Sequence, residues 1–336
     1  MNGLERTLSF LKGEKVDHPP FHPIIMRWAA SYAGVKYRDF CTIPESKCMA
    51  MIQCARDFSI DWVTVMSDPW AEASAFGIDV EYPENDLPLD KGGHLPDALS
   101  ASSLAKYNPL ENTRCMNRLK ELEIFSSRLK NELFIVGWVE GPVAEYVDLR
   151  RASEAAMDLY LDPDNVEKAM DTIVEGAKDF ITLQIKAGAH CIGIGDAFCS
   201  QIGPELYLKF AFNRQKELVD HIHKNGAIAK LHICGNTNSI LEHMIRTGAD
   251  IVDIDHLVPS MAEHVNSLSS TQVFSGKSDP VSVIQDGDRK GIKDSVEQDF
   301  IRSNGKCIVS AGCEITPGTS VENMRAFYVA AKELKG

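Results

Sequence analysis

Residues 227–255, AIAKLHICGNTNSILEHMIRTGADIVDID, decide the fold class, because they read as a strand, a helix and a second strand. The two ends are short apolar runs containing β-branched residues, and the middle has apolar residues at helical spacing. Two strands joined through a helix normally lie parallel in one sheet. The stretch therefore predicts a βαβ unit, and similar apolar runs recur along the chain.

Eight strand candidates are present, and helical patterns lie between most of them. The candidates are FHPIIM (21–26), DWVTVMSD (61–68), LFIVGWVEG (133–141), HCIGIGD (190–196), AIAKLHICG (227–235), DIVDID (250–255), QVFSGKSD (272–279) and KCIVSAGC (306–313). This pattern predicts a single α/β domain over residues 1–336, a (β/α)8 TIM barrel. Residues 69–130 are predicted to form an irregular excursion near the barrel mouth. An open doubly wound sheet is the alternative, but no Gly-rich phosphate turn follows the early strands.

Composition argues against several classes of protein. The chain has 336 residues, 44% of them hydrophobic, which supports a large buried core. Its net charge of −13 makes nucleic acid and anionic membranes poor partners. No apolar window is long enough to span a bilayer, and the first residues do not resemble a signal peptide. Nine cysteines, an odd number, are best explained as reduced thiols, so we expect a cytoplasmic protein.

Polar side chains gather where the predicted strands end. Active sites of (β/α)8 barrels lie at the carboxyl ends of the strands. These ends carry Asp68, Glu140, Asp196, His232 with Cys234, Asp253 with Asp255, Lys277 with Asp279, and Cys313 with Glu314. The sequence therefore predicts one rim rich in metal-binding and acid–base groups.

The segment His232-Ile233-Cys234 is a candidate metal site. Residues two apart in a strand point to the same face, and Cys313 ends a strand at the same predicted rim. One imidazole and two thiolates suit Zn²⁺ and leave its fourth position open for a substrate. The alternative is a core histidine beside two buried thiols, and spacing alone leaves both interpretations open.

The acidic residues of the rim also have two interpretations. Glu140 and Asp196 could act as acid–base groups or orient the ligating imidazole, or they could cap a helix or form a loop salt bridge. Asp253 and Asp255 share a strand face. If both point inward, one would raise the pKa of the other.

Longer motifs carry a resemblance over nearly the whole chain. They are ERTLSFLKGEKVDHPP, VTVMSDPWAEASAFGIDVEY, VGWVEGPVAEY, KLHICGNTNSILEHMIRTGADIVDID and SAGCEITPGTSVENMRAF. In this order they resemble the uroporphyrinogen decarboxylase superfamily, which includes corrinoid-dependent methyltransferases alongside the decarboxylases. The resemblance implies a (β/α)8 barrel, in agreement with the strand count.

Individual residues distinguish the two branches of this superfamily. Decarboxylases resemble one another in an early M-R-Q-A-G-R-Y stretch, and here Arg27 matches but Ser31 replaces the second arginine. Cys313 stands where decarboxylases have a histidine, whereas Asp68 matches their acidic residue. A substrate with eight carboxylates needs a cationic site, which also argues against decarboxylation.

The resemblance therefore implies a zinc-dependent methyltransferase that moves a methyl group between a corrinoid (cobalamin) and a small thiol or an O- or N-methyl compound. The chain has no D-x-H-x-x-G motif, so a separate corrinoid protein is the expected partner. The alternatives are uroporphyrinogen decarboxylase and a non-catalytic corrinoid-binding barrel. The expected roles are metal binding by His232, Cys234 and Cys313, catalysis by Asp68, Glu140 and Asp255, and substrate binding by Arg27, Asp196 and Tyr146.

Three tryptophans, Trp28, Trp70 and Trp138, lie beside these positions. They would either form a wall for an aromatic substrate or pack in the core. The identity of the methyl donor or acceptor and the direction of transfer stay open.

Overall fold

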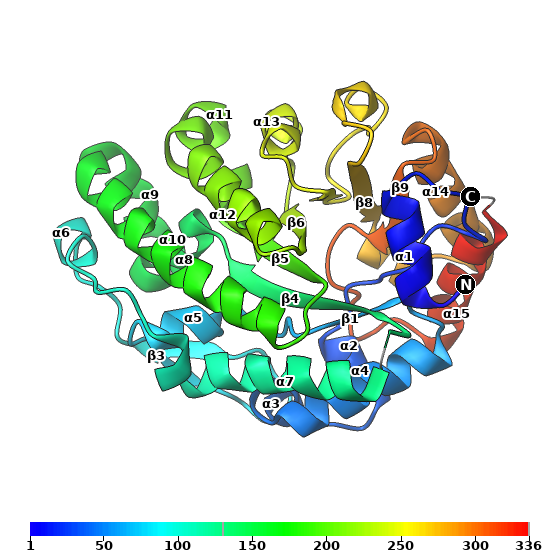
Figure 1. Ribbon diagram of the computed structural model, residues 1–336, viewed down its shortest axis with the longest axis horizontal. Helices are drawn as coiled ribbons and strands as arrows, with labels where there is room; N and C mark the ends of the chain where they lie inside the picture. Colours follow the sequence, from blue (N-terminus) through cyan, green and yellow to red (C-terminus); the bar gives the residue numbers. More distant parts are fainter. Residues whose placement is uncertain (130, 335–336) are drawn as a thin grey trace.

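A curled parallel sheet forms the centre of the computed structural model, which describes residues 1–129 and 131–334 (Figure 1). Its seven strands are β1 (Trp62–Thr64), β4 (Phe134–Glu140), β5 (Cys191–Gly195), β6 (Ile228–Ile233), β7 (Ile251–Ile254), β8 (Val273–Ser278) and β9 (Cys307–Ala311). Their order in the sheet follows their order in the chain, and every neighbouring pair is parallel. This arrangement is compatible with a TIM-like barrel.

Helices surround the outside of the sheet (Figure 1). In the described residues they are α1 (Gly3–Leu11), α2 (Arg27–Tyr32), α3 (Tyr37–Thr42), α4 (Pro44–Asp57), α5 (Trp70–Ala75), α6 (Ala98–Ala101), α7 (Thr113–Leu129), α8 (Pro142–Arg150), α9 (Ala152–Leu161), α10 (Pro163–Lys186), α11 (Gly203–Leu206), α12 (Asn213–Lys224), α13 (Leu241–Arg246), α14 (Arg289–Arg302) and α15 (Val321–Glu333). Each of these helices is too short or too polar to cross a membrane.

The first predicted strand, residues 21–26, does not form. Only one bridge joins this segment to the sheet, between Phe21 and Val309 of β9. The backbone N–H of Asp61 also donates to the carbonyl of Phe21, so the segment lies between β9 and the start of β1. Pro19, Pro20 and Pro23 explain the difference, because proline has no N–H to donate to a ladder.

The prediction of an irregular excursion over residues 69–130 is also wrong in part. It contains α5, α6, the antiparallel pair β2 (Asp79–Glu81) and β3 (Leu89–Gly92), and the 17-residue helix α7. Helix α7 buries Cys115, Leu119, Leu122 and Phe125, which recur every three or four residues. Residues 77–97 are rich in proline, aspartate and glycine, which suggests irregular structure. This composition dominates the segment and hides the helical spacing of apolar residues in α7.

The interior of the curled sheet changes from apolar to polar along the strands. Near the amino ends, Trp62, Phe134 and Ile251 pack together, and Phe10 of α1 joins the same cluster. Near the carboxyl ends, Glu140, Gly195, His232 and Asp253 occupy one row of paired positions on β4 to β7. Because paired residues of parallel strands point to the same face, the polar row faces the interior at one end of the sheet.

Two glycines of β5 make room for an indole inside the sheet. A Cβ atom at Gly193 would lie 2.4 Å from Cε3 of Trp138, and one at Gly195 would lie 2.5 Å from its Cζ2. The Trp138 side chain therefore lies against the bare backbone of β5. The glycine at every second position of CIGIG is thus explained by the bulk of Trp138 on the neighbouring strand β4.

We expect Gly193→Ala to displace this indole and to lower the free energy of unfolding by about 1–3 kcal/mol, the usual cost of overpacking a core. Urea unfolding followed by circular dichroism measures the loss, and tryptophan emission reports the displacement. Gly291→Ala, in an exposed part of α14, should be neutral or slightly stabilising. Unchanged unfolding and emission in the Gly193 variant would contradict the expected clash.

Candidate metal centre

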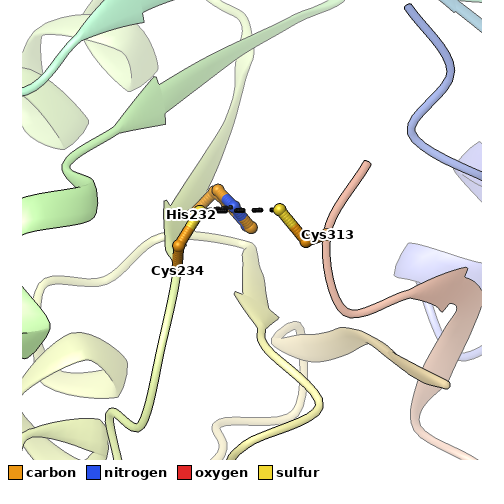
Figure 2. Close-up of side chains that lie close together, drawn as sticks. All are labelled: His232, Cys234 and Cys313. Carbon is orange, nitrogen blue, oxygen red and sulfur yellow. Dashed lines mark hydrogen bonds between the residues drawn. The ribbon is translucent and has the colours of Figure 1, made fainter. Parts of the chain in front are cut away.

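One imidazole and two thiols converge inside the carboxyl-terminal end of the sheet (Figure 2). His232 lies in β6, Cys234 follows that strand, and Cys313 follows β9. His232 Nε2 is 3.0 Å from Cys234 Sγ, which is 3.8 Å from Cys313 Sγ. Strands β7 and β8 separate β6 from β9 in the sheet, so the curl of the sheet brings the three side chains together.

The spacing of these donor atoms fits a tetrahedral zinc ion. Zinc holds sulfur at about 2.3 Å, which places two sulfur ligands about 3.8 Å apart. The sulfurs of Cys234 and Cys313 have this separation, and all three donor atoms lie within 4.8 Å of one another. The imidazole lies nearer to Cys234 than the roughly 3.5 Å expected for two zinc ligands, and a small rotation would correct this. In the described part of the chain, this is the one group of three or more His, Cys, Asp or Glu with converging donor atoms.

Asp253 orients the imidazole, a role that the sequence analysis did not assign. Its Oδ2 lies 2.8 Å from both His232 Nδ1 and Lys230 Nζ. Burial alone would raise the pKa of Asp253, but Lys230 and His232 hold it well below its usual range. A carboxylate at Nδ1 keeps the proton there, so Nε2 is the nitrogen that a metal ion would bind, in place of its proton. The register could have indicated this partner, because His232 and Asp253 are paired residues of β6 and β7.

The charge on the two thiols is unequal. The hydrogen bond with Cys234 and the contact with His232 lower the pKa of Cys313, against the opposing effect of burial. The same hydrogen bond, with burial, raises the pKa of Cys234 well above its usual range. Burial alone would lower the pKa of His232, but Asp253 and Cys313 raise it to about 9. Cys313 is therefore the sulfur that is ready to act as a thiolate ligand.

Asp255 holds the loop that follows Cys234. Its Oδ2 accepts from the backbone N–H of Gly235 (2.9 Å) and its Oδ1 from that of Leu257 (3.0 Å). Gly235 has a φ of +90°, a conformation in which a Cβ would be strained. The predicted catalytic residue Asp255 thus fixes the turn beside a candidate ligand and lies outside the walls of the cavity described next.

A cavity of about 360 Å³ opens onto the three ligand side chains. Its walls are largely apolar and aromatic, which is typical of small-molecule sites. They include Ile24, Met26, Met66, Pro69, Trp70, Leu87, Pro88 and Trp138. Trp70 and Trp138 therefore occupy the expected position of an aromatic wall, whereas Trp28 is buried and packs against Tyr32 and Phe58.

Asp68 and Glu140, both predicted to be catalytic, line this cavity in different charge states. Asp68 accepts from Arg114 (2.5 Å) and Ser67 (2.6 Å), and the two nearby arginines lower its pKa although burial opposes this. Burial and the charge of Glu72 raise the pKa of Glu140 well above its usual range. Asp68 is thus a carboxylate already bound to the protein, whereas the raised pKa of Glu140 favours its neutral, protonated form.

The three residues predicted to bind substrate lie elsewhere. Arg27 pairs with Glu314, whose Oε1 is 3.6 Å from its Nε. Asp196 is fully buried and accepts from the backbone N–H of Ala144 at the start of α8. Tyr146 is also fully buried and donates to Asp158. The cavity walls include none of the three, because each side chain is turned toward a protein partner.

Helix α7 contributes residues that the sequence analysis missed. Arg114 binds Asp68, and Arg118 pairs with Glu72 at 2.9 Å while donating to the carbonyls of Asp68 and Trp138. The missed helix and the missed arginines have the same cause. The Pro-, Asp- and Gly-rich residues 77–97 make the whole segment look irregular, including the helix that carries both arginines.

A second cavity of about 350 Å³ adjoins the first and shares Glu140 and Cys234 with it. Asp148 of α8 also lines it. Burial raises the pKa of Asp148 to about 8, and Glu72, Asp68 and Asp90 act in the same direction. The folded protein therefore binds a proton at Asp148 that the unfolded chain releases near pH 4.

Asp148→Asn should consequently stabilise the protein as the pH rises. A carboxyl whose pKa is raised on folding contributes stability below its unfolded pKa and loses it as the pH approaches the folded value. We expect the variant to exceed the parent by on the order of 2 kcal/mol at pH 8, and by almost nothing at pH 4. Urea unfolding at both pH values measures the difference. A gain of equal size at both values would rule out titration as its cause.

Comparisons with known proteins agree with this fold. Uroporphyrinogen decarboxylases from Prochlorococcus marinus strains MIT 9515 and MIT 9211 are each 28% identical to the chain, over 97% and 96% of its length and 97% and 95% of their own. A solved methyltransferase from Methanosarcina mazei superposes with a TM-score of 0.88 over 99% of both chains at 22% identity. A B12-independent methionine synthase from Shewanella sp. W3-18-1 superposes with a TM-score of 0.58 at 11% identity, over 85% of this chain and 86% of its own.

The family of this chain is shown by a match that covers far more of the sequence than a single motif. The family model described as uroporphyrinogen decarboxylase (URO-D) matches residues 2–334, nearly the whole chain. The chain therefore belongs to the uroporphyrinogen decarboxylase family.

Proposed function

We propose that this protein is a zinc-dependent methyltransferase, which moves a methyl group between a corrinoid held by a separate protein and a small thiol or an O- or N-methyl compound. The observation that carries the proposal is the convergence of His232, Cys234 and Cys313 on the wall of an apolar cavity. Three protein ligands leave one position of a zinc ion for a substrate atom, which is the pattern of catalytic rather than structural zinc.

When bound, the ion would supply Lewis-acid activation of the substrate sulfur, oxygen or nitrogen. The protein's own residues prepare the site for this chemistry. Asp253 keeps the Nδ1 proton of His232 in place, and Asp255 fixes the turn after Cys234. Apolar walls exclude water from the reacting atoms.

Glu140 is placed to handle the proton of the reaction. Its Oε1 accepts from the indole N–H of Trp138 at 2.9 Å, and burial together with the charge of Glu72 raises its pKa, which favours the protonated carboxyl group. Loss of a methyl group from oxygen leaves a basic atom, and transfer to a thiol releases a proton. A neutral carboxyl on the cavity wall can donate the first proton, and its carboxylate can accept the second.

The family also contains decarboxylases, and the curated relatives bear that name. Decarboxylation of uroporphyrinogen is the second candidate, favoured by Asp68 on the cavity wall. Two observations count against it. Asp68 is already bound by Arg114, and the described cavity walls contain no lysine or arginine to receive the carboxylates of the substrate. A non-catalytic corrinoid-binding barrel would have no use for an open zinc position.

The test is a set of measurements on one preparation. We expect about one zinc ion per chain, zinc-dependent demethylation of free methylcobalamin with a thiol or methylation of cob(I)alamin by a methyl compound, and no coproporphyrinogen from uroporphyrinogen. Coproporphyrinogen formation would assign the protein to the decarboxylases. Binding of a corrinoid protein without any methyl transfer would leave the non-catalytic alternative.

A further inference from the structure

The charges around the main cavity are almost all negative or neutral. Its described walls include the carboxyl groups of Asp68, Glu140 and Glu314, and no lysine or arginine. His232 is the one other ionisable nitrogen group in these walls, and it is a candidate metal ligand. An anionic group entering this space would meet no cationic side chain.

Three arginines that neighbour wall residues are paired with carboxyl groups of the protein. Arg114 binds Asp68 and the hydroxyl of Tyr82, and Arg118 binds Glu72 and two backbone carbonyls. Both arginines are buried, at 6% and 0% exposed. Arg27 lies beside Glu314, so this pair adds little net charge. Arg114 and Arg118 therefore balance charges of the protein, and the charge of Arg27 is offset by that of Glu314.

The adjoining cavity offers no cation either. Its described walls carry Glu140 and Asp148, with Ser200 and Gln201 as neutral polar residues. The backbone N–H of Ala144, in the first turn of the helix that borders it, is taken by Asp196. A ligand that extends from the first cavity into the second would therefore meet no cationic side chain in the described walls there either.

The candidate metal ligands would not change this balance. Two thiolates cancel both charges of a zinc ion, and a neutral imidazole adds none. Burying an anion without a cationic partner is costly, because the low dielectric of the interior replaces its hydration.

Building on the proposed function, we infer that the small substrate carries no anionic group, and that its non-reacting part is largely apolar. The substrate class is a thiol, or an O- or N-methyl compound, without an acidic group, whose body packs against Trp70, Trp138 and Met66. Carboxylated or sulfonated analogues with the same reacting atom are rejected.

Matched ligand pairs test this inference by binding alone. Calorimetric titration of the zinc-loaded protein compares 1-propanethiol with 2-mercaptoethanesulfonate, and anisole with 4-methoxybenzoate. We expect the neutral member of at least one pair to bind at least tenfold more tightly than its anionic counterpart. Equal or tighter binding of the anionic members would overturn the inference, and so would the absence of binding by both neutral members.

A charge added to the wall should reverse the preference. Leu87 lines the main cavity and is 43% exposed, so Leu87→Lys can place an ammonium group there without emptying the core. We expect this variant to bind the anionic ligands at least tenfold more tightly than the parent does. Leu89→Lys is the matched control, because Leu89 is 54% exposed and lies outside the described walls. An equal gain in both variants would show a general effect of charge and refute the role of the cavity wall.

Failure of this inference can be separated from failure of the proposed function. Zinc content and methyl transfer with free cobalamin are measured on the same protein. Methyl transfer together with a preference for anionic ligands would refute the charge argument alone. A protein without zinc or methyl transfer would refute the function, whereas the binding comparison would still report on the cavity.

Discussion

Cys313→Ala is expected to abolish zinc binding and methyl transfer while leaving the fold intact. The Cys313 sulfur is one of three donors and the only one contributed from beyond β9, and its pKa is the one lowered toward the thiolate. Loss of a partner that merely orients a ligand costs about 10- to 100-fold in metal affinity. Loss of a ligand itself should therefore cost at least about a hundredfold. Cys313 is only partly buried, so truncation leaves no large core cavity.

The measurement is zinc content after dialysis against a weak chelator, followed by methyl transfer on the same sample. Cys307→Ala is the matched control, because Cys307 lies in β9 with its thiol buried among core residues. It should keep its zinc, even if it loses some stability. Parent-like zinc content in the Cys313 variant would remove the proposed site, and His232→Ala should then be unaffected as well.

Arg118→Met is expected to give the largest loss of stability, about 3–5 kcal/mol, as found when one partner of a buried ion pair is removed. Arg118 is fully buried and binds Glu72 at 2.9 Å. It also donates to the carbonyl of Asp68 after β1 and to that of Trp138 in β4. Methionine fills a similar volume but leaves three acceptors without this donor.

Urea unfolding near pH 8 measures this loss. At lower pH, Glu72 could become protonated and so reduce the cost of leaving its buried charge unpaired. Arg128→Met, on an exposed turn of the same helix, should change stability by less than about 0.5 kcal/mol. The double variant Glu72→Gln, Arg118→Met should recover part of the loss, since it removes the unpaired carboxylate. Equal stability of both single arginine variants would show that the buried pair contributes little.

The strands could be predicted because their signal is local. Runs such as CIGIG and IVDI are short, rich in isoleucine and valine, and almost wholly apolar, as expected for strands covered on both faces, and both form strands. The candidate ligands could be brought together for the same reason, since each ends a strand and parallel strands end at one rim. The absence of the first strand could not be predicted in this way. Residues 21–26 are mostly apolar, and the effect of the three prolines depends on which backbone hydrogen bonds their missing N–H groups would have made.

The residues that set charge at the site were harder to find, because they act across elements. Asp253 was visible as a rim residue, but its pairing with His232 needs the register of two strands. Arg114 and Arg118 come from a helix that the sequence analysis did not predict. Asp196 and Tyr146 were predicted to bind substrate, but both form hydrogen bonds within the protein. A polar residue next to a motif can have a structural role of this kind.

Residues 21–26, which do not form a strand, determine how the curled sheet closes. Along the rest of the sheet, neighbouring strands share ladders of three to five paired residues, whereas β9 meets this segment through one. Cys313 follows β9 on one side of that joint, and His232 and Cys234 extend from the opposite wall. An ion held by all three would tie β9, the strand at that weak joint, to β6 across the interior, so loss of metal should loosen the β9 end of the sheet as well as stop the chemistry.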